Sequence, residues 1–210
     1  MPARDTPKLH PITAPQLKTL NELALAEAQC TRCSLYKFAT QVVPRLRLML
    51  VGEQPGDKED LAGEPFVGPA GRILDAALQA AGIPRSGVFI TNAVKHFKHE
   101  MRGKRRLHKR PNAYEIDRCT WWLDSERAIV KPAAIVALGA TAGRSVFGRV
   151  VTITRMRGQA HQLADGTAAF LTIHPSWLLR IEEEADKQKE HRKFVADLRQ
   201  AAKLLADQAA

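Results

Sequence analysis

The chain has 210 residues, 45% of them hydrophobic, which predicts a single domain (residues 1–210) with a sizeable buried core. No apolar run reaches the roughly 18 residues of a bilayer-spanning helix, and residues 1–15 are too polar for a signal peptide. We therefore expect a soluble, cytoplasmic protein. The net charge of +10 favours a polyanionic partner such as nucleic acid.

Hydrophobic periodicity predicts the elements in chain order. A first helix is expected near Thr13, where Thr-Ala-Pro-Gln matches a capping box with Pro in the first turn. Four apolar runs read as strands: 47–51, 88–91, 133–138 and 168–173. Longer helical patterns cover 69–82, 114–131 and 185–207. Strands alternating with helices predict an α/β fold, a three-layer α/β/α sandwich around a four-stranded parallel sheet.

In such a sheet the ligand site lies beyond the carboxyl ends of the strands. The first strand runs into Gly52-Glu-Gln-Pro-Gly56-Asp57, a turn that can place Glu53 in a cleft, although an ordinary strand-to-loop turn would look the same. Phe66 follows, flanked by glycines and prolines. This context suits a ring presented for stacking on an extruded base better than a core position on a helix.

Polar residues also follow the second and fourth strands. Asn92 can offer both a donor and an acceptor, which suits reading the edge of a pyrimidine. His174, held by Pro175 and followed by Ser176, is a candidate proton donor or electrostatic stabiliser. Each residue alone could equally be structural, as a turn Asn or a buried His.

Three cysteines are too few for a disulfide framework, so a metal or cluster role has to be weighed against three unrelated buried cysteines. Cys30-x2-Cys33 would supply half of such a site, and Cys119 lies far downstream. A fourth ligand must be another residue type, for which His96 and His99 are the nearest candidates. A zinc site with three Cys and one His would satisfy the same spacing.

Residues 95–110 hold eight Lys or Arg and three His against one acidic residue. This stretch is either a flexible, solvated basic loop or a clamp for a phosphate backbone with a His among the cations. Surrounding positive charge favours a neutral imidazole, which is the nucleophilic form.

Taken together, these motifs resemble the family-four uracil-DNA glycosylases. The matching segments, in order, are Gly52–Gly56, Pro65–Gly71, Thr91–Lys95 and His174–Ser176. The resemblance implies the α/β/α fold just described, a [4Fe–4S] cluster and excision of uracil from DNA. It further implies that Phe66 stacks on the base, Asn92 reads its edge, and His174 hydrogen-bonds the uracil carbonyl as negative charge develops.

Three departures from the family pattern resemble UdgX, the branch that becomes covalently attached to uracil-containing DNA. Gln54 replaces Ala, His96 replaces the third cluster Cys, and the added basic loop carries His108. The resemblance implies that His108 attacks the anomeric carbon with help from Glu53. It also implies that the cluster ligands are Cys30, Cys33, His96 and Cys119. The implied substrate contacts are Gln54, Gly56, Asp57, Arg106 and Ser176.

The expected partner is uracil-containing DNA, single-stranded or double-stranded, bound by a monomer that has no membrane partner. Three rival hypotheses stay open. The first is a conventional glycosylase that releases a free abasic site and uses His108 only as a phosphate contact. The second is a non-catalytic nucleic-acid-binding module with a zinc or cluster staple, and the third is an electron-transfer protein.

Overall fold

The computed structural model describes residues 48–207. The chain divides into two compact units between Pro44 and Arg45, and all that follows concerns the second. The helix expected near Thr13 and the Cys30–Cys33 pair lie outside the described residues. No helix within 48–207 is long and apolar enough to cross a membrane.

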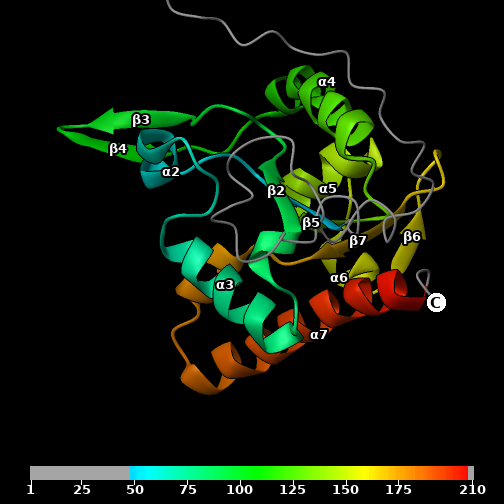
Figure 1. Cartoon of the computed structure of the whole chain (residues 1–210). Helices are drawn as coiled ribbons and strands as arrows, with labels where there is room; N and C mark the ends of the chain where they lie inside the picture. The colour runs from blue at the N-terminus through cyan, green and yellow to red at the C-terminus, as the bar shows by residue number, and fades with distance from the viewer. Residues whose placement is uncertain (1–47, 208–210) are drawn as a thin grey trace, which may run out of the picture. The chain divides into compact units, whose positions relative to one another are not determined.

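The centre of the fold is a five-stranded sheet in the order β2-β1-β5-β7-β6 (Figure 1). Four strands are parallel: β1 (Leu48–Gly52), β2 (Val88–Asn92), β5 (Ala134–Leu138) and β7 (Ala168–Thr172). They coincide within one or two residues with the four predicted strands. The fifth strand, β6 (Ala160–Gln162), runs antiparallel along the edge of β7 and was not predicted, because three half-exposed residues carry no apolar run.

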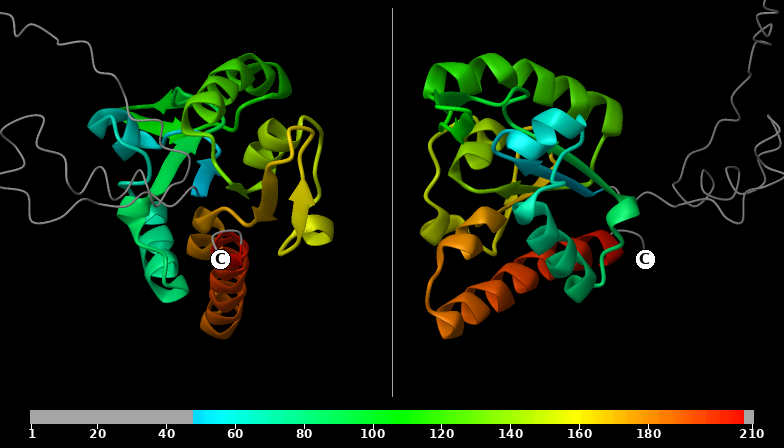
Figure 2. Two further views of the ribbon diagram at one scale, coloured as in Figure 1. Left: turned by 45° about the vertical axis from the view of Figure 1, so that its right-hand side comes forward. Right: turned by 90° about the vertical axis from the view of Figure 1, so that its left-hand side faces the viewer.

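Helices cover both faces of the sheet, so the predicted three-layer α/β/α sandwich is confirmed (Figure 2). Leu48 and Leu50 of β1 face α3 (Pro69–Ala81) and α7 (Glu184–Asp207). Met49 and Val51 point to the opposite face, towards α4 (Ala113–Val130) and α5 (Ala140–Phe147). All four side chains are fully buried, as expected for a strand covered on both faces, where alternate residues enter two different cores.

Local signals set the helix ends. Asn112 caps α4 through a capping box, in which its side chain accepts from the Glu115 amide while the Glu115 carboxylate accepts from the Asn112 amide. Gly82 ends α3 in a left-handed conformation. Shorter elements complete the fold: α2 (Asp57–Ala62), α6 (Ile153–Met156), η2 (Arg85–Gly87) and η3 (Pro175–Arg180).

The basic stretch is an ordered hairpin, not an irregular loop. Strands β3 (His99–Arg102) and β4 (Arg105–His108) pair antiparallel, with His99 opposite His108 and a turn at Gly103. The hairpin projects from the body of the fold beside α2 (Figure 1). Its strands are charged and largely exposed, so they lack the apolar alternation by which a strand is recognised in a sequence.

Candidate active site

One cleft collects the predicted site residues at the carboxyl ends of the parallel strands. It is lined by Glu53 after β1, Asn92 at the end of β2, His174 after β7, Phe66 and His108. Its volume is about 1620 Å³, larger than the roughly 300–1,000 Å³ of most small-molecule pockets. The cleft therefore lies where the strand-end rule predicts a ligand site.

Phe66 and Asn92 meet over Gly52, the last residue of β1. A β-carbon at position 52 would lie 2.4 Å from the Asn92 side-chain oxygen and 2.7 Å from the Phe66 ring. Only Gly allows an aromatic ring and an amide to approach the same point of the backbone. Within residues 48–207 the Asn92 amide group has no hydrogen-bond partner, and it lines the cleft. No other residue of 48–207 therefore competes with a ligand for its donor and acceptor.

The backbone around Phe66 is held in an unusual conformation. Its φ of 60° lies in the left-handed region that few residues other than Gly adopt. The start of α3 encloses it, because a β-carbon at Gly71 would lie only 1.7 Å from the Phe66 carbonyl oxygen. The Glu59 carboxylate also accepts from the Gly68 amide at 2.7 Å. These contacts fix the loop that carries the ring. The Phe66 side chain is only 6% exposed and belongs to the same core as Leu48 and Leu50, yet the residue also lines the cleft. Its ring lies 5.8 Å from the His174 ring at an angle of 30°.

His174 has a defined tautomer. Its Nδ1 accepts a hydrogen bond from the Ser176 amide at 3.2 Å and lies 2.8 Å from the Ser176 hydroxyl oxygen. An Nδ1 that accepts an N–H carries no hydrogen, so the ring hydrogen is on Nε2. Burial lowers the pKa of His174 to about 4, although Glu53 opposes this shift. The imidazole is therefore a neutral donor at neutral pH.

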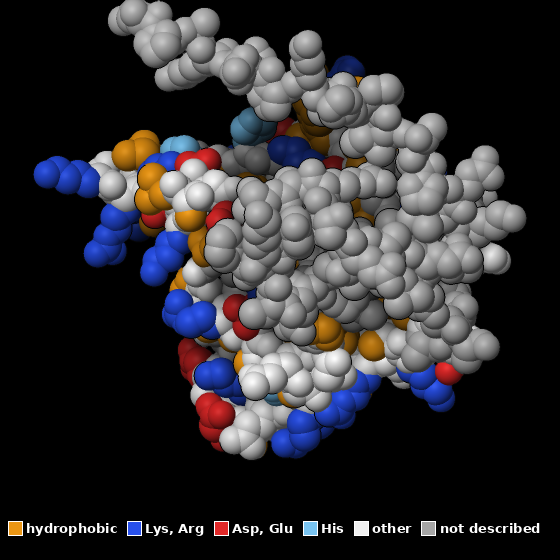
Figure 3. Space-filling model, in the orientation of Figure 1, with side chains coloured by type: hydrophobic (Ala, Val, Ile, Leu, Met, Phe, Trp, Pro, Cys, Tyr) orange, Lys and Arg blue, Asp and Glu red, His pale blue; other side chains and the backbone are white. Residues whose placement is uncertain are grey.

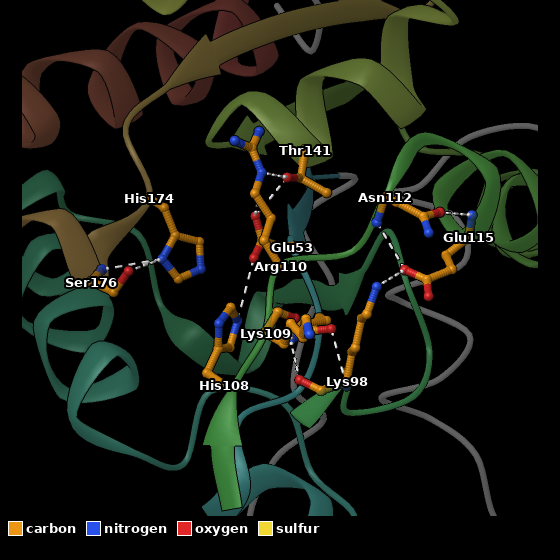
Figure 4. A network of polar contacts seen from close by, with 11 residues as sticks. Glu53, Lys98, His108, Lys109, Arg110, Asn112, Glu115, Thr141, His174 and Ser176 are labelled. Carbon is orange, nitrogen blue, oxygen red and sulfur yellow. Dashed lines mark hydrogen bonds and ion pairs between the residues drawn. The ribbon is translucent and has the colours of Figure 1, made fainter. Parts of the chain in front are cut away.

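His108 and Glu53 form the second pair in the cleft. His108 Nε2 lies 3.3 Å from Glu53 Oε1, while Oε2 accepts from the Thr141 hydroxyl at 2.5 Å (Figure 4). Burial alone would raise the pKa of Glu53, but the hydrogen bonds with His108 and Thr141 outweigh it and lower the pKa below its usual value. The carboxylate is thus ionised and beside an imidazole, an arrangement that can accept a ring proton.

Thr141 was not among the predicted site residues. It lies in the first turn of α5, after β5, and its hydroxyl also lies 3.4 Å from Arg110 Nε. No local motif marks this Thr, and its partner Glu53 is 88 positions away in the chain. The signal that could have identified it is its place just beyond the carboxyl end of β5, where the strand-end rule predicts ligand-binding residues.

Gln54 is buried and ties the hairpin to the sheet. Its amide nitrogen donates to the carbonyls of Lys98 and Lys109, each at 3.2 Å, and its oxygen accepts from the Lys98 amide at 3.1 Å. Gln54 thereby fastens both ends of the hairpin, at Lys98 and Lys109, to the turn that follows β1. Gln54 was predicted to contact substrate, and that contact stays a prediction. These hydrogen bonds give Gln54 a positioning role, because they hold the backbone of Lys109, the residue directly after His108.

Arg106 lies on the same face of the hairpin as His108. Its guanidinium pairs with Asp57 and Asp60 of α2, both at 2.6 Å. Its charge is therefore already matched by two carboxylates, and a contact of Arg106 or Asp57 with DNA stays a prediction.

The tip residues Arg102, Lys104 and Arg105 are exposed, and Figure 3 shows basic side chains at the outer end of the hairpin. Gly56 lies on the cleft wall, as does Ser176.

Two of the four predicted cluster ligands lie within the described residues. Cys119 is half-buried on α4, and His96 is exposed just after β2. Residues 48–207 contain no group of three or more His, Cys, Asp or Glu side chains placed to hold a metal. A thiolate and an imidazole are donor types that suit a cluster or zinc. They could supply half of a four-ligand site, so the donor set fits only when completed from outside residues 48–207.

Comparisons with known proteins agree with this geometry. Residues 39–199 match the family model described as the uracil DNA glycosylase superfamily. The type-4 uracil-DNA glycosylase of Thermotoga maritima is 39% identical over 158 residues, covering 72% of this chain and 79% of the relative. The corresponding proteins of Pyrobaculum aerophilum and Archaeoglobus fulgidus are 34% and 30% identical, covering 78% and 82% of this chain and 85% and 92% of theirs.

Proposed function

This chain belongs to the uracil DNA glycosylase superfamily, and we propose that it excises uracil from DNA and then bonds covalently to the abasic sugar through His108. The observation that carries the second half is the His108–Glu53 pair, 3.3 Å apart in the cleft that also holds Phe66, Asn92 and His174. The partner is uracil-containing DNA, single-stranded or double-stranded, acted on by a monomer.

The first step breaks the glycosidic bond. Uracil must leave the base stack or be met in a single strand, because its glycosidic bond is inaccessible inside a duplex. Phe66 stacks on the base, and the Asn92 amide pairs with its edge. The bonding electrons pass to the uracil ring as the bond to the anomeric carbon breaks. Nε2–H of neutral His174 donates to the uracil carbonyl oxygen where this charge gathers, which typically contributes on the order of 3 kcal/mol.

The second step forms the new bond. Loss of uracil leaves an oxocarbenium-like sugar, and a lone pair on one ring nitrogen of His108 attacks its anomeric carbon. The imidazolium that results gives the proton on its other ring nitrogen, its single N–H, to Glu53, whose carboxylate is ionised and adjacent. Confinement lets an imidazole outcompete water, because effective molarities of oriented groups can reach about 10⁵ M or more.

The cofactor in this proposal is a [4Fe–4S] cluster held by Cys30, Cys33, His96 and Cys119. When bound, it would serve as a structural crosslink. Within the described residues, His96 follows β2 and Cys119 lies on α4, so its ligands join the end of the base-reading strand to the longest helix of that face. Iron and sulfide analysis of His96→Ala tests the fourth ligand, since an unchanged cluster would remove His96 from the set.

A denaturing gel tests the function directly. The protein is mixed with a labelled single-stranded oligonucleotide that holds one uracil, boiled in detergent and resolved beside a thymine-only strand and a His108→Ala reaction. A heat-stable, slower band that requires both uracil and His108 is expected. Free DNA that breaks at the uracil position under alkali would instead identify a conventional glycosylase. Unmodified DNA on this gel, together with a shifted band on a native gel, would identify a binding module.

A further inference from the structure

Lys95 begins the basic stretch, yet its ammonium group faces the protein and not the solvent. Its Nζ lies 2.7 Å from the Asn92 carbonyl oxygen, 2.9 Å from the Thr91 hydroxyl and 2.7 Å from Glu126 Oε2 on α4. An ammonium group has three hydrogens, so these three oxygens satisfy all of them. The Lys95 and Glu126 side chains are only 20% and 28% exposed. Lys95 is therefore unsuited to a phosphate contact.

The contacts form a closed network around the end of β2. The Thr91 hydroxyl accepts from Lys95 and donates to Glu126 Oε1 at 3.1 Å. The following turn is fastened to the end of β1, because the Ala93 and Val94 amides donate to the Gly52 and Glu53 carbonyls, both at 2.9 Å. The backbone of Asn92 is thus held from one side by β1 and from the other by Lys95.

The side chain of Asn92 has no comparable restraint. No described residue hydrogen-bonds its amide, and its oxygen lies against Gly52. The direction in which this amide faces the cleft is therefore set by packing and by the backbone that carries it. A rotation of the Asn92 peptide would turn the donor and acceptor away from the base edge. Lys95 binds the carbonyl of that peptide.

We propose that Lys95, together with Thr91 and Glu126, is a positioning unit that sets the uracil selectivity of Asn92. This inference rests on the proposed function, since it assumes that Asn92 reads a pyrimidine. It assigns two charged residues that face each other inside the fold, Lys95 and Glu126, to base recognition, although neither touches the base. Glu126 lies on α4, so its bond with Lys95 makes the position of that helix part of what orients Asn92.

The sharpest test uses Thr91, where two substitutions separate the network from simple packing. Thr91→Val keeps the shape and removes the hydroxyl, whereas Thr91→Ser keeps the hydroxyl and removes a methyl group. Binding is measured with single strands that carry one 2′-fluoro-2′-deoxyuridine or one 2′-fluoro-2′-deoxycytidine. Cytosine presents a donor and an acceptor where uracil presents an acceptor and a donor, and the fluorine disfavours the oxocarbenium ion and prevents cleavage. The readout is the ratio of the two dissociation constants, with the melting temperature of each variant recorded beside it.

Thr91→Val and Lys95→Met are expected to lower the preference for uracil about tenfold, and Thr91→Ser to retain it. Equal preference in Thr91→Val and wild type would overturn the inference and leave the proposed function intact. A preference that falls in Thr91→Ser as much as in Thr91→Val, in step with melting temperature, would overturn it in favour of a packing role. Wild-type protein without any uracil preference would overturn both the inference and the proposed function.

Discussion

The proposed base pocket (Phe66, Asn92 and His174) and the hairpin are built in different ways, although both contribute to one cleft. The pocket residues Phe66, Asn92 and His174 lie on strand ends or enclosed loops of the sheet, and they are positioned by buried strands and by glycines that permit close approach. His108 instead lies on an exposed two-stranded arm. The arm is fastened by the Gln54 amide at its base and by the Arg106 ion pairs beyond it.

This difference divides the chemistry into two parts. Parallel strands with both faces covered give a rigid platform, which suits recognition of a base and stabilisation of its negative charge. A tethered arm can carry a nucleophile to the sugar without altering that platform. Disturbing the pocket should therefore slow uracil release and capture together, while disturbing the arm should slow capture alone.

The largest effect is expected for His174→Ala. Removal of the Nε2–H donor leaves the developing uracil charge without its partner, so the rate of uracil release should fall about 100- to 1000-fold. Capture should fall by the same factor, because it follows release. Free uracil is measured by chromatography and the adduct by denaturing gel, both under single-turnover conditions. An undiminished rate of release would show that His174 is not the electrostatic stabiliser.

Gln54→Leu should separate the two regions. The substitution keeps the volume but leaves the Lys98 and Lys109 backbone groups without the amide that binds them, at a typical cost of about 1–3 kcal/mol. The arm is then less often in place, so we expect capture to slow about tenfold while uracil release changes little. Gln54→Glu is the matched comparison. It can still accept from the Lys98 amide, but it sets a carboxylate oxygen against the Lys98 and Lys109 carbonyls, so it should slow capture at least as much as Gln54→Leu.

If Gln54→Leu slows uracil release as much as capture, the residue belongs to the pocket and contacts substrate. That outcome would support the substrate contact predicted from the sequence. It would also remove the distinction between a rigid platform and a tethered arm.

The sequence predicted the platform well and the arm poorly, for physical reasons. Buried parallel strands are continuous apolar runs, so β1, β2, β5 and β7 could be read directly, and their carboxyl ends located Glu53, Asn92 and His174. The hairpin strands bury little, so a charged stretch gave no sign of β3 and β4. Long-range polar contacts were equally hidden. Neither Thr141 beside Glu53 nor Lys95 beside Glu126 can be paired from sequence spacing.

A smaller effect is expected where the arm meets α2. Arg106→Gln removes the pairs with Asp57 and Asp60, which are partly exposed and therefore contribute modestly. Capture should slow no more than about threefold, measured as adduct formed per unit time at fixed salt. The double variant Asp57→Asn, Asp60→Asn removes the same pairs and leaves the guanidinium free. A rate that falls much further in Arg106→Gln than in this double variant would mean that Arg106 also contacts DNA.

The smallest expected effect is that of pH on the rate of uracil release, which should not change between pH 8 and pH 5. The pKa of His174 is about 4, so the donor of the release step does not change its proton as the pH falls from 8 to 5. Uracil release by the His108→Ala variant should therefore be level across this range. Near pH 4, His174 gains a proton on Nδ1, which breaks the bond from the Ser176 amide and turns the ring, so release should then slow.

Wild-type protein assayed over the same range provides the comparison, because only it carries His108. A pH dependence that appears in wild-type capture and is missing from His108→Ala release would place the titrating group on the hairpin. A bend near pH 6.5 in the variant itself would contradict the argument, since 6.5 is the ordinary pKa of His and would mean that burial does not keep His174 neutral. His174 would then gain a charge in the physiological range. A fixed, neutral donor would no longer explain how the proposed base pocket stabilises the departing base.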